Sequence, residues 1–339
     1  MKALVKTARG YGNLELMDIP IPKCGPDDAL MRVWGSGICG TDVHIYHDEY
    51  SVYVPPLTIG HEFSAEVVEV GRNVTNVKPG DRVVCDVTTK TGVMGNDTVN
   101  GCHAEYIVMP ANLVLKLPDN ISLREAVLME PIVACQHGIL ERTRIRPGDF
   151  VVVIGPGPIG LMMLQVAKLY SPIDTVITGR RGVDEPRLKV ARELDAGHVL
   201  FHDENVVEQV MKWTHGKGAD VVIEASGSDL GFNQALDMAK MGGQILSYSV
   251  YDNTYVKANL SKISWKCLDV TSSWCFWGYT EEATRATGGI VSWQRAIKIL
   301  ATGKLNLKPF ITHELPLEDW KEGFRICEEK EGVKVVLRP

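Results

Sequence analysis

The stretch FVVVIGPGPIG, residues 150–160, decides how this sequence folds. A short apolar run of strand type leads directly into three glycines, Gly155, Gly157 and Gly160, in G-x-G-x-x-G spacing. The apolar residues 158–170 that follow indicate a helix. A glycine-rich turn that joins a strand to a helix predicts a βαβ unit.

The residues beyond this turn repeat the same alternation. Expected strands and helices follow one another as strand 175–179, helix 185–196, strand 198–201, helix 204–216, strand 219–227, helix 229–240 and strand 243–250. Alternation at this spacing predicts a doubly wound parallel sheet, and therefore an α/β fold.

The two ends of the chain have a different pattern. The first 130 residues consist of short β-type runs separated by Gly/Pro turns, which is typical of a β-rich domain. After about residue 275 the pattern is mixed, with expected helices at 292–303 and 317–330 and a last strand at 333–339. A length of 339 residues also favours about two domains.

Composition excludes several classes of protein. The hydrophobic fraction of 45% and the charged fraction of 23% are ordinary for a soluble globular protein. A net charge of −6 without a dense Lys/Arg run argues against a nucleic-acid partner. No apolar run reaches transmembrane length and no signal-peptide core is visible, so we expect a cytoplasmic protein without a membrane partner. The 8 cysteines are scattered, and we expect mostly reduced thiols.

The glycine-rich turn is a candidate dinucleotide-binding site. Gly155 permits a tight turn, Gly157 lets the backbone approach a pyrophosphate, and Gly160 lets the helix pack on the strand. Pro158 and Ile159 lie at the start of the helix, whose N-terminus would face the phosphates. We therefore expect all five residues to contact a dinucleotide.

The end of the next expected strand selects the dinucleotide. An acidic residue there would hold the ribose hydroxyls of NAD, but the sequence has Gly179 followed by Arg180 and Arg181. Arginines can bind a 2′-phosphate through paired charged hydrogen bonds, which favours NADP(H) over NAD(H). The alternative is that both arginines are merely solvated and Asp184 holds the ribose.

A second set of polar residues lies in the β-rich region. The runs GSGICGTDVH and IGHEF, residues 35–44 and 59–63, contain Cys39, His44, His61 and Glu62 close to glycine-rich turns. Thiolate, imidazole and carboxylate groups suit zinc, and three protein ligands with an open position are typical of a catalytic zinc site.

These motifs together resemble the zinc-dependent medium-chain dehydrogenase/reductase superfamily, and within it the sorbitol (polyol) and threonine dehydrogenase branch. The resemblance covers essentially the whole chain and is carried by G-I-C-G-T-D-x-H at 37–44, G-H-E-F at 60–63, V-K-P-G-D-R-V at 77–83, M-E-P at 129–131, GPGPIG at 155–160 and KPFITHELPLEDW at 308–320. It implies a GroES-like catalytic domain at 1–133, completed by 276–339, and a Rossmann domain at 134–275. The active site would lie in the cleft between the two domains.

The resemblance also implies the metal ligands. Cys39 and His61 correspond to zinc ligands of the family. Glu62 and Glu130 are both candidates for the third protein ligand, and the sequence does not decide between them. Glutamate at position 130, where other alcohol dehydrogenases of the superfamily have a ligand cysteine, is typical of the polyol and threonine branch.

Further roles follow from the same resemblance. Thr41 and His44 correspond to the hydroxyl and imidazole of a proton relay, so that Thr41, His44, Glu62 and Glu130 are the candidate catalytic residues. Zinc would lower the pKa of a substrate hydroxyl, and the nicotinamide would exchange a hydride with the substrate. The implied protein is a zinc-dependent, NADP(H)-preferring oxidoreductase that interconverts a secondary alcohol, such as a polyol or sugar alcohol, and a ketone.

Two other functions remain open at this point. The nearer one is an NAD(H)-dependent dehydrogenase of an amino alcohol or of a sugar-alcohol phosphate. The more remote one is a non-enzymatic NADPH-binding protein on the same fold. A homodimer or homotetramer is expected from the resemblance alone.

The segment between Cys85 and Cys102 stands where many relatives have a lobe with four closely spaced cysteines that bind a structural zinc. Here only these two cysteines remain, and they form no C-x-x-C pair. A structural zinc needs four ligands. Asp86, Asp97 and His103 could complete such a set, but strand alternation and turn residues explain them without a metal. We therefore expect one catalytic zinc and no structural zinc.

Overall fold

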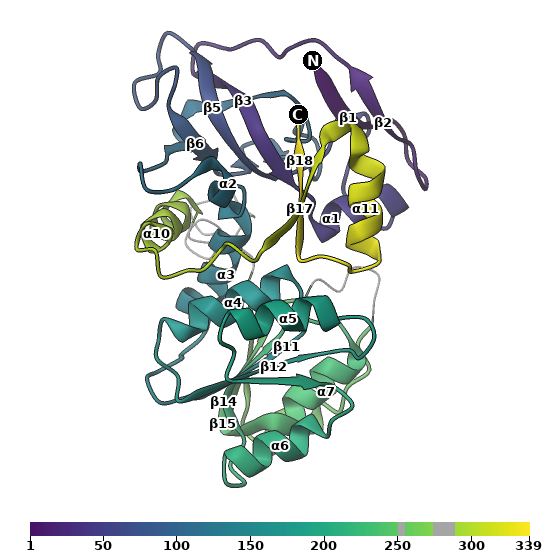
Figure 1. Ribbon diagram of the computed structural model, residues 1–339, viewed down its shortest axis with the longest axis vertical. Coiled ribbons are helices and arrows are strands. Elements are labelled where there is room, and N and C mark those ends of the chain that lie inside the picture. Colours follow the sequence, from purple (N-terminus) through teal and green to yellow (C-terminus); the bar gives the residue numbers. More distant parts are fainter. Residues whose placement is uncertain (250–254, 274–288) are drawn as a thin grey trace. The chain divides into compact units, whose positions relative to one another are not determined.

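The computed structural model describes residues 1–249, 255–273 and 289–339 (Figure 1). The chain forms two compact units. The first comprises Met1–Val133, Cys275–Gly303 and Ile311–Pro339, and the second comprises Ala134–Trp274 and Lys304–Phe310. The expected domain junction at residues 275 and 276 lies outside the described residues.

The second unit contains a six-stranded parallel sheet with the strand order β13-β12-β11-β14-β15-β16. Its strands are β11 (Phe150–Ile154), β12 (Asp174–Gly179), β13 (His198–Phe201), β14 (Ala219–Glu224), β15 (Ala239–Ser247) and β16 (Asp269–Ser272). Its helices are α4 (Pro158–Lys168), α5 (Glu185–Glu193), α6 (Val206–Trp213), α7 (Asp229–Met238) and α8 (Ser261–Trp265). The predicted doubly wound sheet is confirmed, and α8 and β16 extend it beyond the expected elements.

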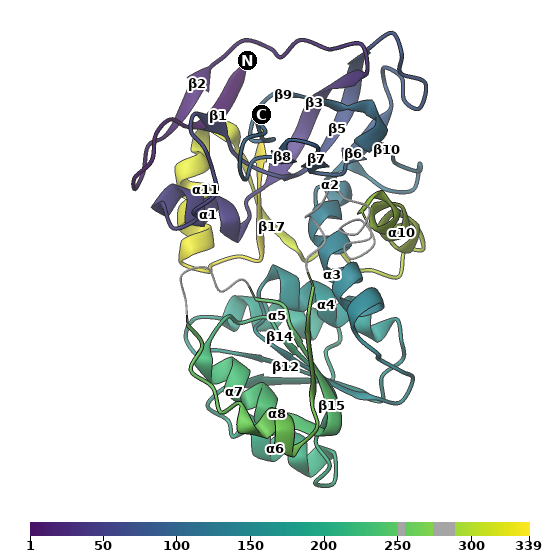
Figure 2. The same ribbon diagram turned by 180° about the vertical axis from the view of Figure 1, so that it is seen from behind.

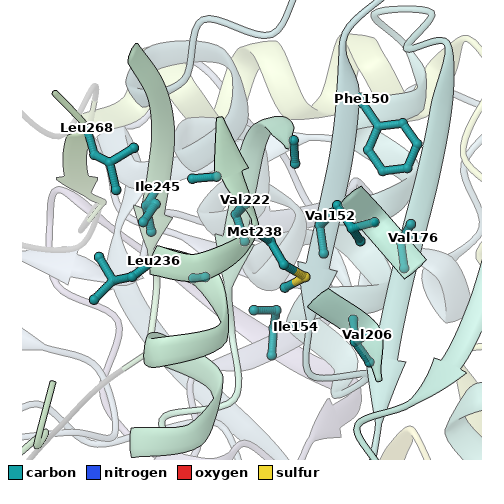
Figure 3. Close-up of a cluster of buried hydrophobic side chains, with 14 residues drawn as sticks. Phe150, Val152, Ile154, Val176, Val206, Val222, Leu236, Met238, Ile245 and Leu268 are labelled. Carbon is teal, nitrogen blue, oxygen red and sulfur yellow. The ribbon is translucent and has the colours of Figure 1, made fainter. Parts of the chain in front are cut away.

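The core of the second unit explains why its strands are so apolar. Alternate residues of β11, Phe150, Val152 and Ile154, join one hydrophobic cluster with side chains from α6 and α7 (Figure 3). The intervening Val151 and Val153 are also fully buried. Both faces of the strand are therefore covered, as expected of a parallel sheet between two layers of helices.

The segment 304–310 packs with the second unit, although the division expected from the sequence assigned all of 276–339 to the first. Gln165 on α4 explains this difference. Nε2 of Gln165 donates to the carbonyl of Asn306 (3.1 Å), and the backbone N–H of Asn306 donates to Oε1 of Gln165 (2.7 Å). Because Gln165 is nearly fully buried, this reciprocal pair attaches the segment firmly.

The first unit is built mainly of antiparallel strands. One sheet has the order β2-β1-β4, a larger one has the order β10-β6-β5-β3-β18-β17 with β9 on β3, and β7 pairs with β8. The strands are β1 (Lys2–Lys6), β2 (Leu14–Asp18), β3 (Asp28–Gly37), β4 (Leu57–Thr58), β5 (Glu62–Val70), β6 (Arg82–Cys85), β7 (Thr88–Thr89), β8 (Gly92–Val93), β9 (Tyr106–Pro110), β10 (Val114–Lys116), β17 (Ile311–Pro316) and β18 (Lys334–Arg338).

Short helices connect these strands. They are α1 (Gly40–His47), η1 (Ala111–Leu113), α2 (Leu123–Ala126), α10 (Gly289–Ala301), η2 (Leu317–Asp319) and α11 (Trp320–Glu328), and α3 (Met129–Arg142) begins in the first unit and ends in the second. None of the described helices is long and apolar enough to cross a membrane.

The C-terminal residues complete the sheet that the N-terminal residues begin. Strand β18 pairs antiparallel with β3 and parallel with β17, and both views show it beside β3 (Figures 1 and 2). One hydrophobic cluster contains Ile45 of α1, Phe324 of α11 and Leu337 of β18. Residues from opposite ends of the chain thus form one core.

The glycine-rich turn between β11 and α4 has tight packing at two of its three glycines. Gly155 has a φ of +100°, which favours glycine. A Cβ on Gly160 would lie 1.9 Å from the carbonyl oxygen of Gly155, whereas a Cβ on Gly157 would meet nothing within 4 Å. The fold therefore requires glycine at 155 and 160 but not at 157.

We predict that Gly160→Ala lowers the free energy of unfolding by roughly 1–3 kcal/mol, since the added methyl group must push the turn away from the helix. Gly157→Ala is the matched control and should cost only about 0.5 kcal/mol, the small difference between glycine and alanine at a helix N-cap. Denaturant unfolding of both variants measures this. Equal losses would contradict the close approach at Gly160.

Candidate active site

Three potential metal ligands converge in the first unit. One ligand atom from each of Cys39, His61 and Glu62 lies within 4.8 Å of the others. Within the described ranges, this is the single group of three or more Cys, His, Asp and Glu ligand atoms that approach so closely. The structure therefore brings together three of the four expected ligands.

The register between β3 and β5 and the start of α1 bring these three residues together. Gly37, at the end of β3, pairs with Glu62, at the start of β5, and α1 begins directly after its N-cap Cys39. A Cβ on Gly37 would lie 2.4 Å from a carboxylate oxygen of Glu62, so only glycine leaves room for that side chain. The backbone N–H of Cys39 donates to Oδ2 of Asp42 (2.8 Å), which fixes the start of the helix.

A buried lysine pairs with the carboxylate of the cluster. Nζ of Lys334, the first residue of β18, donates to Oε1 of Glu62 (2.7 Å) and lies 2.6 Å from Oε2. It also donates to the carbonyl of Ile38 (3.2 Å). Burial alone would lower the pKa of Lys334, but Glu62 and then Cys39 raise it above its ordinary value. The negative charge of Glu62 is therefore balanced inside the protein.

The thiol of Cys39 is not a thiolate in the protein alone. Burial, and next the carboxylate of Glu62, raise its pKa to about 12, against the opposing charge of Lys334. A thiol binds metal only after it loses its proton. A nearby divalent cation would favour that loss.

Glu130 has a similar electrostatic position at the start of α3. Burial raises its pKa well above the ordinary value; the neighbouring His61 opposes this shift, and the neighbouring Glu62 and Cys39 add to it. Its carboxylate does not belong to the group within 4.8 Å. Glu130 is therefore buried in the electrostatic field of the cluster without joining its closest contacts.

The residues present fit a zinc ion. Nδ1 of His61 is buried without a hydrogen-bond partner among the described residues, as is Oδ1 of Asp42. Sulfur, nitrogen and carboxylate oxygen donors form the usual ligand set of catalytic zinc. When Cys39, Glu62 and Glu130 are all ionised, two charges on zinc and one on Lys334 would balance their three negative charges.

Helix α1 carries the two residues of the expected relay. Sγ of Cys39 is 3.8 Å from the hydroxyl oxygen of Thr41. His44, one helical turn later, is exposed, and its Nδ1 lies 2.9 Å from a carboxylate oxygen of Glu49. The helix thus leads from the buried cluster to the surface, and the relay itself stays a prediction.

The candidate dinucleotide residues at the end of β12 form ion pairs. The backbone N–H and Nε of Arg180 both donate to Oδ2 of the buried Asp184 (2.9 and 3.1 Å). The guanidinium of Arg181 pairs with Asp203 (3.2 Å) and Glu204 (2.9 Å). Arg180 and Asp184, which were alternatives for recognition of the adenosine ribose end, therefore bind each other, whereas Arg181 binds a separate pair of carboxylates.

Gly179 leaves no room for a side chain at the end of this strand. A Cβ there would lie 2.8 Å from Cγ of Pro156 and 3.1 Å from Cβ of Asp184. An acidic residue at this position would therefore force its neighbours apart. Asp184 supplies the nearest carboxylate instead, and Arg180 neutralises it.

Asp97 and Cys102, in the segment from Cys85 to Cys102, have hydrogen-bond partners within the protein. The backbone N–H of Val93 donates to both carboxylate oxygens of Asp97 (3.0 and 2.9 Å), which therefore caps a turn. Both cysteines are buried free thiols, and Sγ of Cys102 donates to the carbonyl of Glu62 (3.6 Å). Over the described part of the chain, these residues form no second group of ligands.

Sequence reasoning missed two residues that contact the group of potential ligands. Lys334 stands beside an apolar strand, and a lysine in such a run is a signal of a buried ion pair. Asp42 lies three residues after Cys39, which is the position of a capping carboxylate. Both signals are visible in the sequence, but neither identifies the partner.

Comparison with known families agrees with this geometry. Residues 25–119 match the alcohol dehydrogenase GroES-like domain, and residues 158–287 match the zinc-binding dehydrogenase domain. A sorbitol dehydrogenase of Halalkalibacterium halodurans is 33% identical, over 100% of this chain and 99% of the relative. An L-threonine 3-dehydrogenase of Bacillus licheniformis is 35% identical, again over 100% and 99%.

A solved structure has the same fold. It was assigned as a zinc-binding dehydrogenase of Sinorhizobium meliloti 1021 and holds NADP. It superposes with a TM-score of 0.87 at 26% identity, over 100% of this chain and 99% of the other. The chain therefore belongs to the zinc-dependent medium-chain dehydrogenase/reductase superfamily, in its polyol and threonine dehydrogenase branch, and is a zinc-dependent alcohol dehydrogenase.

Proposed function

We propose that this enzyme interconverts a secondary alcohol, a polyol or sugar alcohol, and the corresponding ketone with a preference for NADP(H). The observation that carries this proposal is the cluster of Cys39, His61 and Glu62. Burial and the charge of Glu62 raise the pKa of the Cys39 thiol, and a bound cation would favour its ionised form. Bound zinc would acidify the substrate hydroxyl, and the nicotinamide would exchange the hydride. Residues 1–133 with 276–339 form the proposed catalytic domain, and 134–275 the proposed coenzyme domain.

The protein's own groups have distinct proposed roles. Cys39 and His61 bind the metal, and Glu62 and Glu130 are the two carboxylates that offer a third ligand. Lys334 holds Glu62 in the cluster whether or not that carboxylate reaches the ion. Thr41 takes the substrate proton towards His44, whose exposed ring can release it to solvent.

The proposed cofactor site lies at the glycine-rich turn and the end of β12. Gly157, Pro158 and Ile159 would face the pyrophosphate at the N-terminus of α4. Arg180 and Arg181 would bind the 2′-phosphate of NADP(H) by exchanging their carboxylate partners for it. Both side chains are about half exposed, so such an exchange needs no unpacking of the core.

A second candidate function is an NAD(H)-dependent dehydrogenase of an amino alcohol or sugar-alcohol phosphate. The buried carboxylate of Asp184 favours it, since an acidic group beside this strand end can accept hydrogen bonds from ribose hydroxyls. Steady-state assays of polyols, amino alcohols and sugar-alcohol phosphates with each dinucleotide, on protein of measured zinc content, separate the two functions.

We further propose a homodimer or homotetramer in the cytoplasm. Strand β16 is an edge of the parallel sheet among the described strands, and it carries the exposed Val270. An open edge with an apolar side chain is a usual place for association. Sedimentation or light scattering measures the assembly.

Removing the metal should remove activity. We predict that Cys39→Ser loses bound zinc and dehydrogenase activity together, because the hydroxyl is a much poorer zinc ligand than a thiolate. A chelator should do the same to the unaltered protein. Cys267→Ser changes an exposed cysteine outside the cluster and is the control. Full activity in protein shown to be free of metal would refute the proposed mechanism.

Exchanging the arginines should change the cofactor preference. The double variant Arg180→Asp with Arg181→Ala should lose roughly ten- to hundredfold in kcat/KM with NADP(H) relative to NAD(H), the value of one or two hydrogen bonds to a charged group. Arg192→Ala removes an exposed arginine from α5 and should leave the preference unchanged. An unchanged ratio in the double variant would instead favour Asp184 as the ribose ligand.

The zinc content should be one ion per subunit. Asp97 is bound in a turn and Cys85 is buried beside the carbonyl of Asp86, so this region offers no set of four ligands. Elemental analysis of purified protein, normalised to subunit concentration, measures the ratio. A ratio of two would show that the shortened lobe still binds a structural zinc.

A further inference from the structure

A buried chain of polar groups lies beside the metal cluster. The hydroxyl oxygen of Ser36 is 2.7 Å from Nδ1 of His103, and Nε2 of His103 is 3.4 Å from Oδ2 of Asp42. All three residues are fully buried. Because an ionised carboxylate can only accept, Nε2 of His103 donates to Asp42. That same oxygen accepts the backbone N–H of Cys39, so the chain ends on a metal ligand.

The other side of His103 touches the turn that carries the second ligand. A Cβ on Gly60, the residue before His61, would lie 2.7 Å from Cγ of the His103 ring. The backbone N–H of His103 donates to the carbonyl of Ile59 (3.0 Å), and that of Cys102 donates to the carbonyl of Gly60 (2.9 Å). Residues 102 and 103 thus hold the turn in place from one side.

Asp42 lies between His103 and Cys39. Its Oδ2 accepts from Nε2 of His103 and from the backbone N–H of Cys39. Its second oxygen, Oδ1, and Nδ1 of His61 are both buried and have no partner within the described ranges. The position of the Asp42 carboxylate therefore depends on the contact of its Oδ2 with His103.

We propose that His103 is a positioning residue of the metal centre. It holds Asp42, and through it the backbone of Cys39, on one side, and it packs against the turn before His61 on the other. The inference rests on the proposed zinc site. Groups that orient metal ligands typically change metal affinity about 10–100-fold when they are removed, which sets the expected effect.

Three substitutions separate hydrogen bonding from packing. His103→Phe keeps a ring against Gly60 but removes both hydrogen bonds. His103→Gln can place an amide near the position of Nε2 and keep the bond to Asp42. His103→Asn can reach only the position of Nδ1 and therefore keeps the bond to Ser36. Of these variants, only His103→Gln should preserve the orientation of Asp42.

The measurements are made on the full chain with zinc and Co²⁺ as probes. Zinc affinity is measured by equilibrium competition with a chromophoric chelator, the visible absorption of the Co²⁺-loaded protein reports ligand geometry, and thermal unfolding of the metal-free protein reports structural damage. We expect about a 10–100-fold weaker zinc affinity and altered Co²⁺ bands for His103→Phe and His103→Asn. His103→Gln should stay close to the unaltered protein.

Two results would overturn the inference. In one, His103→Phe binds zinc as tightly as the unaltered protein and has the same Co²⁺ bands. In the other, zinc affinity in all three variants falls only in step with the unfolding temperature of the metal-free protein, which would make His103 a packing residue. The unaltered protein is tested first, and a failure to bind zinc there would overturn the proposed function and this inference together.

Discussion

The buried ion pair between Lys334 and Glu62 is the interaction on which the proposed catalytic centre depends. It joins the last strand of the chain to the first residue of β5 across 272 residues of sequence. Removing one partner of such a pair typically costs about 3–5 kcal/mol, because the remaining charge stays buried without compensation. The C-terminal strand therefore supplies a charge to the cluster as well as a place in the sheet.

The charge of Glu62 also affects the protonation of the neighbouring Cys39 and Glu130. Cys39 and Glu130 both have raised pKa values, since burial and the charge of Glu62 favour their neutral forms. Because Lys334 is paired with Glu62, a divalent ion at the cluster would supply the further positive charge that favours the ionised forms of Cys39 and Glu130.

In the second unit, close backbone packing rather than buried charge shapes the proposed cofactor site. Gly160 lies against the carbonyl of Gly155, and Gly179 lies against Pro156, so that the ends of β11 and β12 pack directly on the glycine-rich turn. A side chain at position 160 or 179 would therefore meet neighbouring atoms. In the proposed cofactor site, recognition of the ribose would fall to Arg180 and Asp184, which bind each other just beyond the strand end.

The sequence alone determined the features whose causes are local. The glycine-rich turn and the motif around Cys39 depend on residues within one or two elements, and the parallel sheet was indicated by the repeated alternation of strand and helix patterns. The partners of His103 and Glu62 were decided by tertiary structure, because Ser36 is 67 residues from His103 and Lys334 is 272 residues from Glu62. Pairing of β5 and β18 with β3 brings Glu62 and Lys334 together, and a one-residue change in register would send their side chains to the opposite face of the sheet. His103 lies outside the strands and is held by its backbone bond to Ile59.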